Sequence, residues 1–252
     1  MMSKFESMPD RFVVLATPRC GSNWLCSLLD SHPDILCHHE LFNLERIRLS
    51  RSLAANPGFL GDMESRQAAP REFLNKAWNK SLGHKAVGFK LNLGQSEIIF
   101  DEVLDDPKVA KIIISRRNRV RSFVSEMIAE KTKIWESFPD SEPMPDPGPQ
   151  KVEAAELFEQ VRRNQDYYTA LRQRLDATGQ TALEVQYEQL NDRQQHQTIL
   201  DFLQLDVDVA LTTATSKMNR GSLRVLISNF DQLAGQLSHS ELLDDLSSGE
   251  SQ

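Results

Sequence analysis

Apolar runs alternate with amphipathic ones along most of the chain. Residues 11–16 read Arg-Phe-Val-Val-Leu-Ala, which is apolar and β-branched enough for a buried parallel strand. In the run that follows, Trp24, Leu25 and Leu28 fall on one face at helical spacing. The same pattern predicts further strands at 34–38, 86–91, 109–115 and 182–186, and helices at 22–30, across 43–80, and at 96–104, 119–136, 151–177, 194–204 and 222–236. This order is typical of an α/β fold in which helices flank a central, mostly parallel sheet.

The turn between the first strand and the first helix reads Thr17-Pro18-Arg19-Cys20-Gly21-Ser22-Asn23-Trp24. The N–H groups and the positive dipole end at a helix N-terminus attract anions. Ser22 and Asn23 add a hydroxyl and an amide, and Arg19 brings a permanent charge whose forked donors suit phosphate or sulfate oxygens. The turn therefore predicts a phosphate-binding loop, and the chain a P-loop-like three-layer fold.

Two common phosphate-binding loops do not match this turn. The loop of nucleotide triphosphatases needs a lysine, but none occurs between Phe5 and Lys76. A tyrosine-phosphatase loop needs an arginine six residues after its cysteine, where this chain has Cys26, so Cys20 is expected to be a small loop residue. The turn instead resembles the loop by which sulfotransferases hold the 5′-phosphosulfate of 3′-phosphoadenosine 5′-phosphosulfate (PAPS). The resemblance implies that the donor is bound by Arg19, Cys20, Gly21, Ser22, Asn23 and Trp24.

A second sulfotransferase-like motif follows the strand predicted at 109–115. The family carries an Arg-Asn pair at a strand end and a serine eight residues after that arginine, and Arg117, Asn118 and Ser125 match this spacing. An arginine there can make bidentate contacts with the 3′-phosphate, and the serine can donate its hydroxyl. Alone, the arginines of 116–121 would be a solvated basic face. In a chain of net charge −7 they indicate a local anion site, and they are poor support for nucleic-acid binding.

The resemblance extends to two further stretches. Tyr187 begins a Tyr-Glu-Gln-Leu sequence similar to the family's Tyr-Glu-x-Leu, in which the tyrosine often lies beside the adenine. Trp24 matches a family aromatic that packs on the adenine, although an isolated tryptophan is more often core. The segment that starts at Lys217 looks like the closing segment of bacterial carbohydrate-type sulfotransferases, where basic residues cover the nucleotide. Arg224 is the candidate there, with a helix-surface charge as the alternative.

Sulfuryl transfer requires that negative charge on the leaving oxygens be stabilised. The eukaryotic loop usually has lysine where this chain has Arg19, and an arginine cannot act as the proton donor, so we expect Arg19 to act electrostatically. Lys90 matches a strand-borne lysine of the cytosolic sulfotransferases and is placed near the transferred group by that resemblance. Arg19 and Lys90 are therefore two predicted catalytic residues.

The acceptor hydroxyl also needs a base. Cytosolic sulfotransferases use a histidine two residues after the lysine, but Asn92 stands there and cannot accept the proton. Bacterial trehalose-type sulfotransferases place a glutamate after the segment that corresponds to 35–37, which makes Glu40 the first candidate if partial burial raises its pKa. His39 is the second candidate. For both, an exposed loop residue or a neighbour of a helix cap is the structural alternative.

Composition narrows the class of protein. A chain of 252 residues is expected to form one domain, 1–252, with flexible ends at 1–10 and about 245–252 and a mobile proline-rich loop at 138–150. The three cysteines, an odd number close together, favour reduced thiols, and no zinc spacing or other metal site is evident. We find no leader-like apolar region and no stretch long enough to span a bilayer, so a cytoplasmic location is expected.

The sequence thus predicts a PAPS-dependent sulfotransferase of the bacterial carbohydrate type, which uses no metal and transfers a sulfuryl group to a hydroxyl of a carbohydrate or other small metabolite. Adenosine 3′,5′-bisphosphate (PAP) would be the second product. No nucleic-acid or membrane partner is expected, and a homodimer stays open because some bacterial relatives are dimers. A nucleotide-dependent phosphotransferase, or a non-catalytic relative that binds PAPS or PAP, remains as an alternative.

Overall fold

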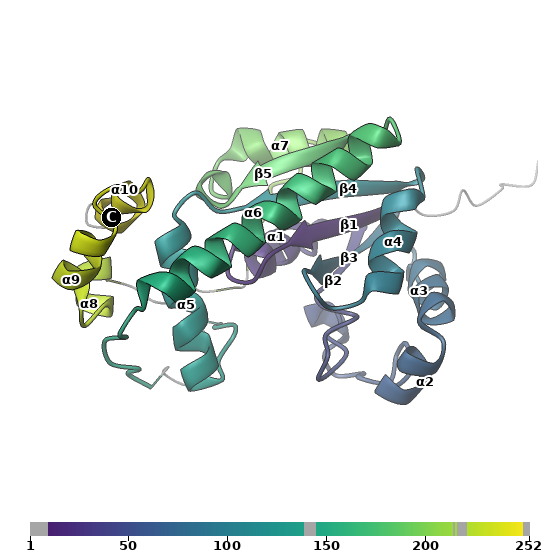
Figure 1. The fold of residues 1–252 in the computed structure, drawn as a ribbon. Helices are drawn as coiled ribbons and strands as arrows, with labels where there is room; N and C mark the ends of the chain where they lie inside the picture. The colour runs from purple at the N-terminus through teal and green to yellow at the C-terminus, as the bar shows by residue number, and fades with distance from the viewer. Residues whose placement is uncertain (1–9, 139–144, 214, 216–220, 249–252) are drawn as a thin grey trace, which may run out of the picture.

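A five-stranded parallel sheet forms the centre of the protein (Figure 1). The structure is a computed structural model that describes residues 10–138, 145–213, 215 and 221–248. Its strands are β1 (Asp10–Ala16), β2 (Ile35–His38), β3 (Ala86–Asn92), β4 (Val109–Ser115) and β5 (Ala182–Gln186). They lie in the order β2-β3-β1-β4-β5, so the first strand is central. The predicted α/β class and parallel sheet are confirmed.

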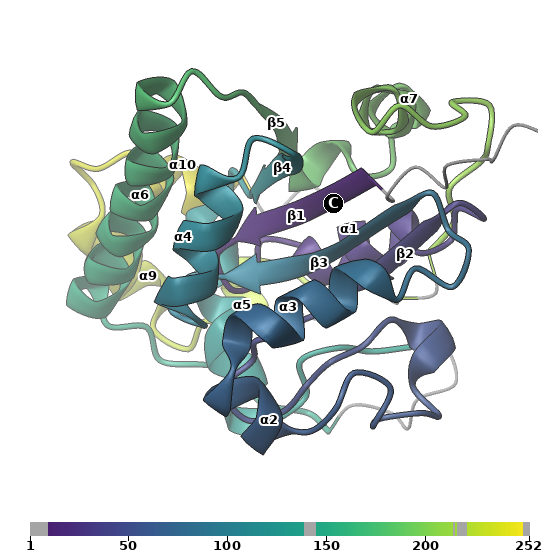
Figure 2. The same ribbon diagram turned by 90° about the vertical axis from the view of Figure 1, so that its right-hand side faces the viewer.

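Helices cover both faces of this sheet. Alternating side chains of β1 serve the two faces: Phe12 and Val14 join one apolar cluster, and Val13 and Leu15 join the other. The first cluster packs under α1 (Ser22–Leu29) and α7 (Arg193–Phe202); the second packs under α3 (Pro70–Asn79), α4 (Glu97–Asp105) and α6 (Ala154–Ala177). Figure 2 shows α3 running beside β3, next to α4. The result is the expected three-layer arrangement.

A third apolar cluster lies beyond the end of the sheet. It joins α5 (Arg119–Thr132) and the start of α6 to the short helices α8 (Leu223–Leu226), α9 (Phe230–Gln236) and α10 (Leu242–Ser247), drawn in yellow in Figure 1. Leu242 and Leu246 are buried in it, and Asp245 accepts a hydrogen bond from the Arg119 side chain at 2.6 Å. The prediction that flexibility begins near residue 245 was therefore wrong for residues 245–248.

Other predicted flexible segments are also shorter than expected. β1 already begins at Asp10. The N–H of Gln150 donates to the carbonyl of Leu226 at 2.7 Å, so the proline-rich stretch 138–150 ends in an anchored residue. Residues 1–9, 139–144 and 249–252 lie outside the described residues.

The helix boundaries of the structure differ most from the predicted ones where the chain has glycine, proline or a residue with a left-handed φ. Of the helices predicted across 43–80, only a 3₁₀ turn (Arg51–Leu53), α2 (Met63–Ala68) and α3 form, because Pro57, Gly58 and Gly61 interrupt the pattern. The helix predicted at 119–136 ends at Thr132, where Lys133 adopts a left-handed φ of 59°. A second 3₁₀ turn (Tyr187–Gln189) follows β5 directly.

Gly21 has both a left-handed backbone and a close neighbour. Its φ is 95°, and a Cβ there would lie 2.3 Å from Cδ2 of Tyr187. Gly179 also has a left-handed φ, of 65°, but a Cβ there would have no atom within 4 Å, so it differs from Gly21 in having no close neighbour. We expect Gly179→Ala to cost about 1–2 kcal/mol of unfolding free energy, the strain of a left-handed residue with a Cβ. Gly21→Ala should cost clearly more, because the Tyr187 ring must also move.

Urea unfolding followed by circular dichroism would measure both losses. Equal losses of unfolding free energy in the two variants would contradict the close packing of the Tyr187 ring against Gly21.

Candidate active site

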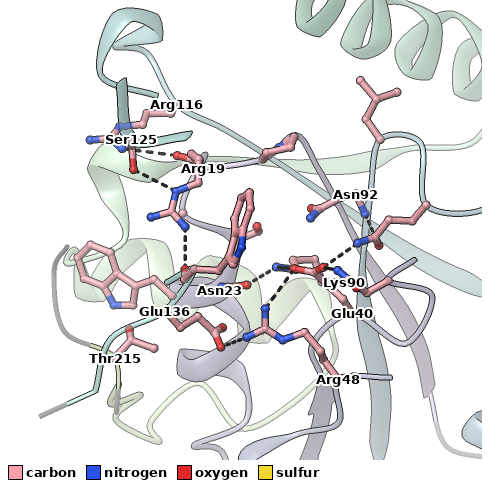
Figure 3. Close-up of a pocket in the computed structure, with 18 of the residues that line it drawn as sticks. Arg19, Asn23, Glu40, Arg48, Lys90, Asn92, Arg116, Ser125, Glu136 and Thr215 are labelled. Atoms are coloured by element: carbon pink, nitrogen blue, oxygen red, sulfur yellow. Dashed lines mark hydrogen bonds and ion pairs between the residues drawn. The ribbon is translucent and has the colours of Figure 1, made fainter. Parts of the chain in front are cut away.

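The loops that follow the strands enclose a pocket of about 630 Å³ at the carboxyl edge of the sheet (Figure 3). Its walls come from the segments after all five strands and from the chain that follows α5. β1 and β4 are neighbours, but their outgoing connections lead to opposite sides of the sheet. Such a switch point opens a crevice in parallel sheets and is their usual ligand site.

The turn after β1 presents the start of α1 to this pocket. Thr17 is held by the Tyr168 hydroxyl, 3.2 Å from its N and 3.0 Å from its Oγ1. α1 has no capping side chain and no acidic residue in its first turn, so its leading N–H groups and dipole suit an anion. Ser22, Asn23 and Trp24 line the pocket together with Gly21, and their binding of a phosphate stays a prediction.

Cys20 does not line the pocket, although it belongs to the same turn. Its side chain is 2% exposed and packs in the apolar cluster under α1. Burial raises the pKa of its thiol, which disfavours a thiolate nucleophile. The Cys20 side chain thus lies outside the pocket lining, and the part of Cys20 in binding a donor stays a prediction.

Arg19 reaches across the pocket to α5. Its Nε donates to Ser125 Oγ at 3.0 Å, and its Nη1 donates to the Trp135 carbonyl at 2.7 Å. Figure 3 shows the guanidinium between Ser125 and the segment that carries Glu136. Arg19 and Ser125, which are both predicted to bind PAPS, are 106 positions apart in the sequence and in direct contact in the structure.

A stack of three side chains forms the adjoining wall. The Arg116 guanidinium lies 4.1 Å from the centre of the Tyr187 ring, and this ring meets Trp24 edge-on with centroids 5.6 Å apart. Nε of Arg116 and Nε1 of Trp24 are buried with no hydrogen-bond partner among the described residues. Two buried N–H groups therefore lie beside two aromatic rings. This arrangement suits a negatively charged group attached to a planar base.

Arg117, the arginine matched by motif spacing, is placed differently. Its side chain is exposed and does not line the pocket; its backbone N–H binds the Glu188 carboxylate at 3.1 Å. Arg116 and Arg121 face the pocket instead. Successive side chains at a strand end point to opposite sides, so a displacement of one residue decides which arginine enters the pocket. Spacing alone located the cluster but selected a residue whose side chain lies outside.

Arg224 is also outside the pocket. It lies on α8, in the third cluster, where it pairs with Asp231 at 3.0 Å and lies over the Phe230 ring. The structure therefore favours the helix-surface alternative. Within the segment that starts at Lys217, residues 217–220 lie outside the described residues.

Lys90 and Glu40 form a buried ion pair on the pocket floor. Nζ of Lys90 lies 2.6 Å from Oε1 of Glu40 and also donates to Asn23 Oδ1. Oε2 of Glu40 accepts bonds from Asn43 at 2.6 Å and Gln95 at 2.7 Å. The Lys90 and Glu40 side chains are 2% and 8% exposed, so the pair is shielded from water. Both predicted catalytic residues therefore lie beside the start of α1.

The protonation of Glu40 differs from the expectation. Burial alone would raise the pKa of its carboxyl, but Lys90, Asn43 and Arg48 stabilise the anion more strongly and lower the pKa to about 2. The expected raised pKa was wrong, because the sequence did not show how many donors surround the carboxylate. Glu40 is an ionised and weakly basic carboxylate before any ligand binds.

A second carboxylate enters the pocket from the chain after α5. Glu136 pairs with Arg48, and its Oε1 lies 3.2 Å from Nδ1 of His39. Burial would raise the pKa of Glu136, but His39, Arg48 and Lys90 lower it to about 2. The sequence analysis missed Glu136 and Arg48, because both fell inside predicted helices, whereas the structure places them in irregular chain with no motif.

His39 itself does not line the pocket. Its carbonyl accepts the Lys90 N–H at 2.8 Å, and its ring faces Glu136. His39 thus supports the pocket floor and is less suited than Glu40 to meet an acceptor hydroxyl.

The pocket is basic overall although the chain is acidic. Seven lysine and arginine side chains but only three glutamates line it. Within the described ranges, no three His, Cys, Asp or Glu side chains gather in a way that could hold a metal ion. None of the helices in those ranges combines the length and apolar character needed to cross a bilayer.

Comparison with known proteins yields matches of two kinds. The sequence is 29% identical to nodulation protein H of Rhizobium meliloti over 149 residues, 55% of each chain, and 33% identical to nodulation protein H of Rhizobium tropici over 139 residues, 52% of this chain and 50% of that one. The chain therefore spans about half the length of the curated relatives it matches. No protein-family model matches it.

Among solved structures, the sulfotransferase of Alicyclobacillus acidocaldarius aligns with a TM-score of 0.49 and 16% identity, over 96% of this chain and 95% of that one. A mouse sulfotransferase complexed with PAP aligns with a TM-score of 0.45 and 14% identity, over 97% and 90%. The chain is similar to sulfotransferases.

The two pocket carboxylates should make stability depend on pH. A carboxyl whose pKa is lower in the folded than in the unfolded chain stabilises the fold above its ordinary pKa, here 4.5, and this stabilisation is lost as the pH falls toward about 2. Each pKa unit corresponds to about 1.4 kcal/mol. We expect the unfolding free energy to fall between pH 4.5 and 2, and to fall less steeply in Glu40→Gln.

Chemical denaturation at several pH values would measure the slope. Glu45→Gln, a change at an exposed glutamate of the same pocket rim, is the control and should keep the wild-type slope. A wild-type slope in Glu40→Gln would show that Glu40 does not hold a lowered pKa.

Proposed function

We propose that this protein transfers a sulfuryl group from PAPS to a hydroxyl of a carbohydrate or other small metabolite, as a metal-independent sulfotransferase of the bacterial carbohydrate type. The observation that carries the proposal is the combination, in one pocket, of an uncapped helix N-terminus, an arginine lying on the Tyr187 ring, and a buried lysine–carboxylate pair. These three parts suit a phosphosulfate, a phosphorylated adenosine and an acceptor hydroxyl.

The donor would lie along the wall formed by the loop and the stack. Arg19 and the N-terminus of α1 would hold the 5′-phosphosulfate. Arg116, with Ser125 and Arg121 nearby, would hold the 3′-phosphate, in place of the exposed Arg117. Tyr187 and Trp24 would lie beside the adenine, and the adenine would lie near Arg116.

The acceptor would enter above Lys90 and Glu40. Its hydroxyl oxygen would form the new bond to sulfur, while the bond from sulfur to the 5′-phosphate oxygen breaks and PAP leaves with that electron pair. Arg19 and Lys90 would stabilise the charge that develops on the oxygens around sulfur and on the leaving phosphate. Glu40 would take the proton of the hydroxyl, a transfer that becomes easier once the hydroxyl has begun to bond to sulfur.

The remaining predictions join this proposal. Residues 1–252 would act as one domain in the cytoplasm, on a small-molecule acceptor, without nucleic-acid or membrane partners, and a homodimer stays open. A phosphotransferase would instead favour ATP over PAP, and a non-catalytic relative would bind PAP without turnover. Both alternatives are outcomes of the experiments that follow.

Calorimetric titration with PAP, adenosine 5′-monophosphate and ATP tests the donor site. We expect wild-type protein to prefer PAP, because only PAP offers a 3′-phosphate to Arg116. Arg116→Ala should lower PAP affinity about tenfold or more, the cost of losing a charge-assisted contact. Arg117→Ala is the matched control and should bind PAP like wild type, because Arg117 is exposed and does not line the pocket.

A loss confined to Arg117→Ala would instead restore the assignment made from motif spacing. Tighter binding of Mg²⁺-ATP than of PAP would overturn the sulfotransferase proposal in favour of a phosphotransferase.

Turnover tests the catalytic pair. With PAPS and a panel of sugars as acceptors, we expect Lys90→Met and Glu40→Gln each to lower kcat about 100-fold or more, since each removes a charge or a base needed in the transition state. PAP affinity in calorimetry should stay within a few-fold of wild type in folded protein. Unchanged kcat in Glu40→Gln would remove Glu40 from the proposed mechanism.

A further inference from the structure

Gln95 occupies the turn between β3 and α4, in the pocket wall, and its side chain is held at both ends. Its Oε1 accepts the backbone N–H of Asn92 at 3.0 Å, and its Nε2 donates to Oε2 of Glu40 at 2.7 Å. Because the amide oxygen is bound to an N–H group, the amide nitrogen must face the carboxylate. Gln95 therefore ties Glu40 to the end of β3.

Asn43 is fixed in the same way from the opposite segment. Its Oδ1 accepts the N–H of Glu45 at 3.0 Å, and its Nδ2 donates to the same Oε2 of Glu40 at 2.6 Å. Two neutral amides thus hold one oxygen of Glu40, and both amides line the pocket.

The two oxygens of Glu40 consequently differ. Oε1 faces cations, with Lys90 Nζ at 2.6 Å and Arg48 Nη1 at 3.9 Å. Both lone pairs of Oε2 are occupied by amide N–H groups, whereas Oε1 has one close donor, the Lys90 ammonium. Oε1 is therefore the oxygen that keeps a lone pair for a further hydroxyl.

We propose that Gln95 is a positioning residue, which holds Oε2 of Glu40 so that Oε1 meets the acceptor hydroxyl, and which controls when the carboxylate is protonated. The inference rests on the proposed function. Gln95 is better placed for this role than Asn43, because its Oε1 is bound to the N–H of Asn92, the last residue of the strand that also carries Lys90. One strand thus sets the positions of the cation and the base, and the hydroxyl would approach Oε1 of Glu40 beside Lys90.

The groups around Glu40 give the sign of the effect. Lys90 on β3 and Arg48 after β2 face the carboxylate, and Glu136 lies behind Arg48. Lys90, Arg48 and the amide hydrogen bonds favour the ionised form of Glu40, so removal of an amide donor must raise the pKa of its carboxyl. A carboxylate placed where the amide nitrogen stood must raise it further by like-charge repulsion.

Two variants of Gln95 provide the test. Gln95→Glu keeps the shape and the oxygen that accepts the Asn92 N–H but replaces the donor with a charge, and Gln95→Ala removes both ends. Gln160→Ala is the matched control, because Gln160 donates the same kind of amide bond to the Glu126 carboxylate outside this pocket.

Carbon-13 NMR of the glutamate carboxyls, with Glu40 assigned from Glu40→Gln, would follow the titration directly. We expect Glu40 to titrate at higher pH in Gln95→Ala and higher still in Gln95→Glu. In steady-state assays with PAPS, kcat should fall about tenfold, the acid limb of its pH profile should move upward, and KM for PAPS should stay unchanged. Gln160→Ala should change none of these quantities.

An unchanged Glu40 titration in Gln95→Glu would overturn the inference, as would a lower kcat with no movement of the titration or of the pH profile. Failure of the proposed function looks different: wild-type protein would neither bind PAP nor turn over PAPS. The NMR titration would then still decide whether Gln95 controls the protonation of Glu40.

Discussion

The pocket depends on the buried ion pair between Lys90 and Glu40. Two charges removed from water are tolerated only when each has a partner and their remaining hydrogen-bonding capacity is used. Asn23, Asn43 and Gln95 meet that requirement; Asn23 lies in the first turn of α1, and the other two lie in the segments after β2 and β3. The pair therefore holds the start of α1 and the segments after β2 and β3 in one arrangement. Removing Glu40 would leave the Lys90 ammonium buried without its carboxylate partner, at a cost of about 3–5 kcal/mol.

The charges of the pocket are distributed unevenly between its two ends. At the floor, each cation faces a carboxylate: Lys90 faces Glu40, and Arg48 faces Glu136. Along the wall, Arg19 donates to a hydroxyl and a carbonyl, and Arg116 lies on an aromatic ring. An anion gains most along the wall, whereas a neutral hydroxyl compound meets a balanced floor. The uneven distribution of charge thus favours an anion at the wall and a neutral compound at the floor, which the net charge of the pocket alone could not specify.

The sequence predicted what depends on local pattern. Strand and helix order follow from hydrophobic period, and the loop at Arg19 and the residues Ser125, Tyr187, Lys90 and Glu40 follow from motifs next to strands. What it could not predict depends on contacts between distant segments. The pKa of Glu40 reflects donors on β3 and in the segment after β2, Glu136 lies in irregular chain, and the choice between Arg116 and Arg117 depends on one residue of register.

The Tyr187 ring fills the space that a side chain at position 21 would occupy. One face of the loop after β1 is therefore built by a residue that follows β5, more than 160 positions away along the chain. During evolution, positions 21 and 187 cannot vary independently: a larger residue at 21 demands a smaller ring at 187. A relative that has lost this aromatic keeps only the left-handed φ as a reason for glycine in its loop, so the constraint on position 21 should be weaker there.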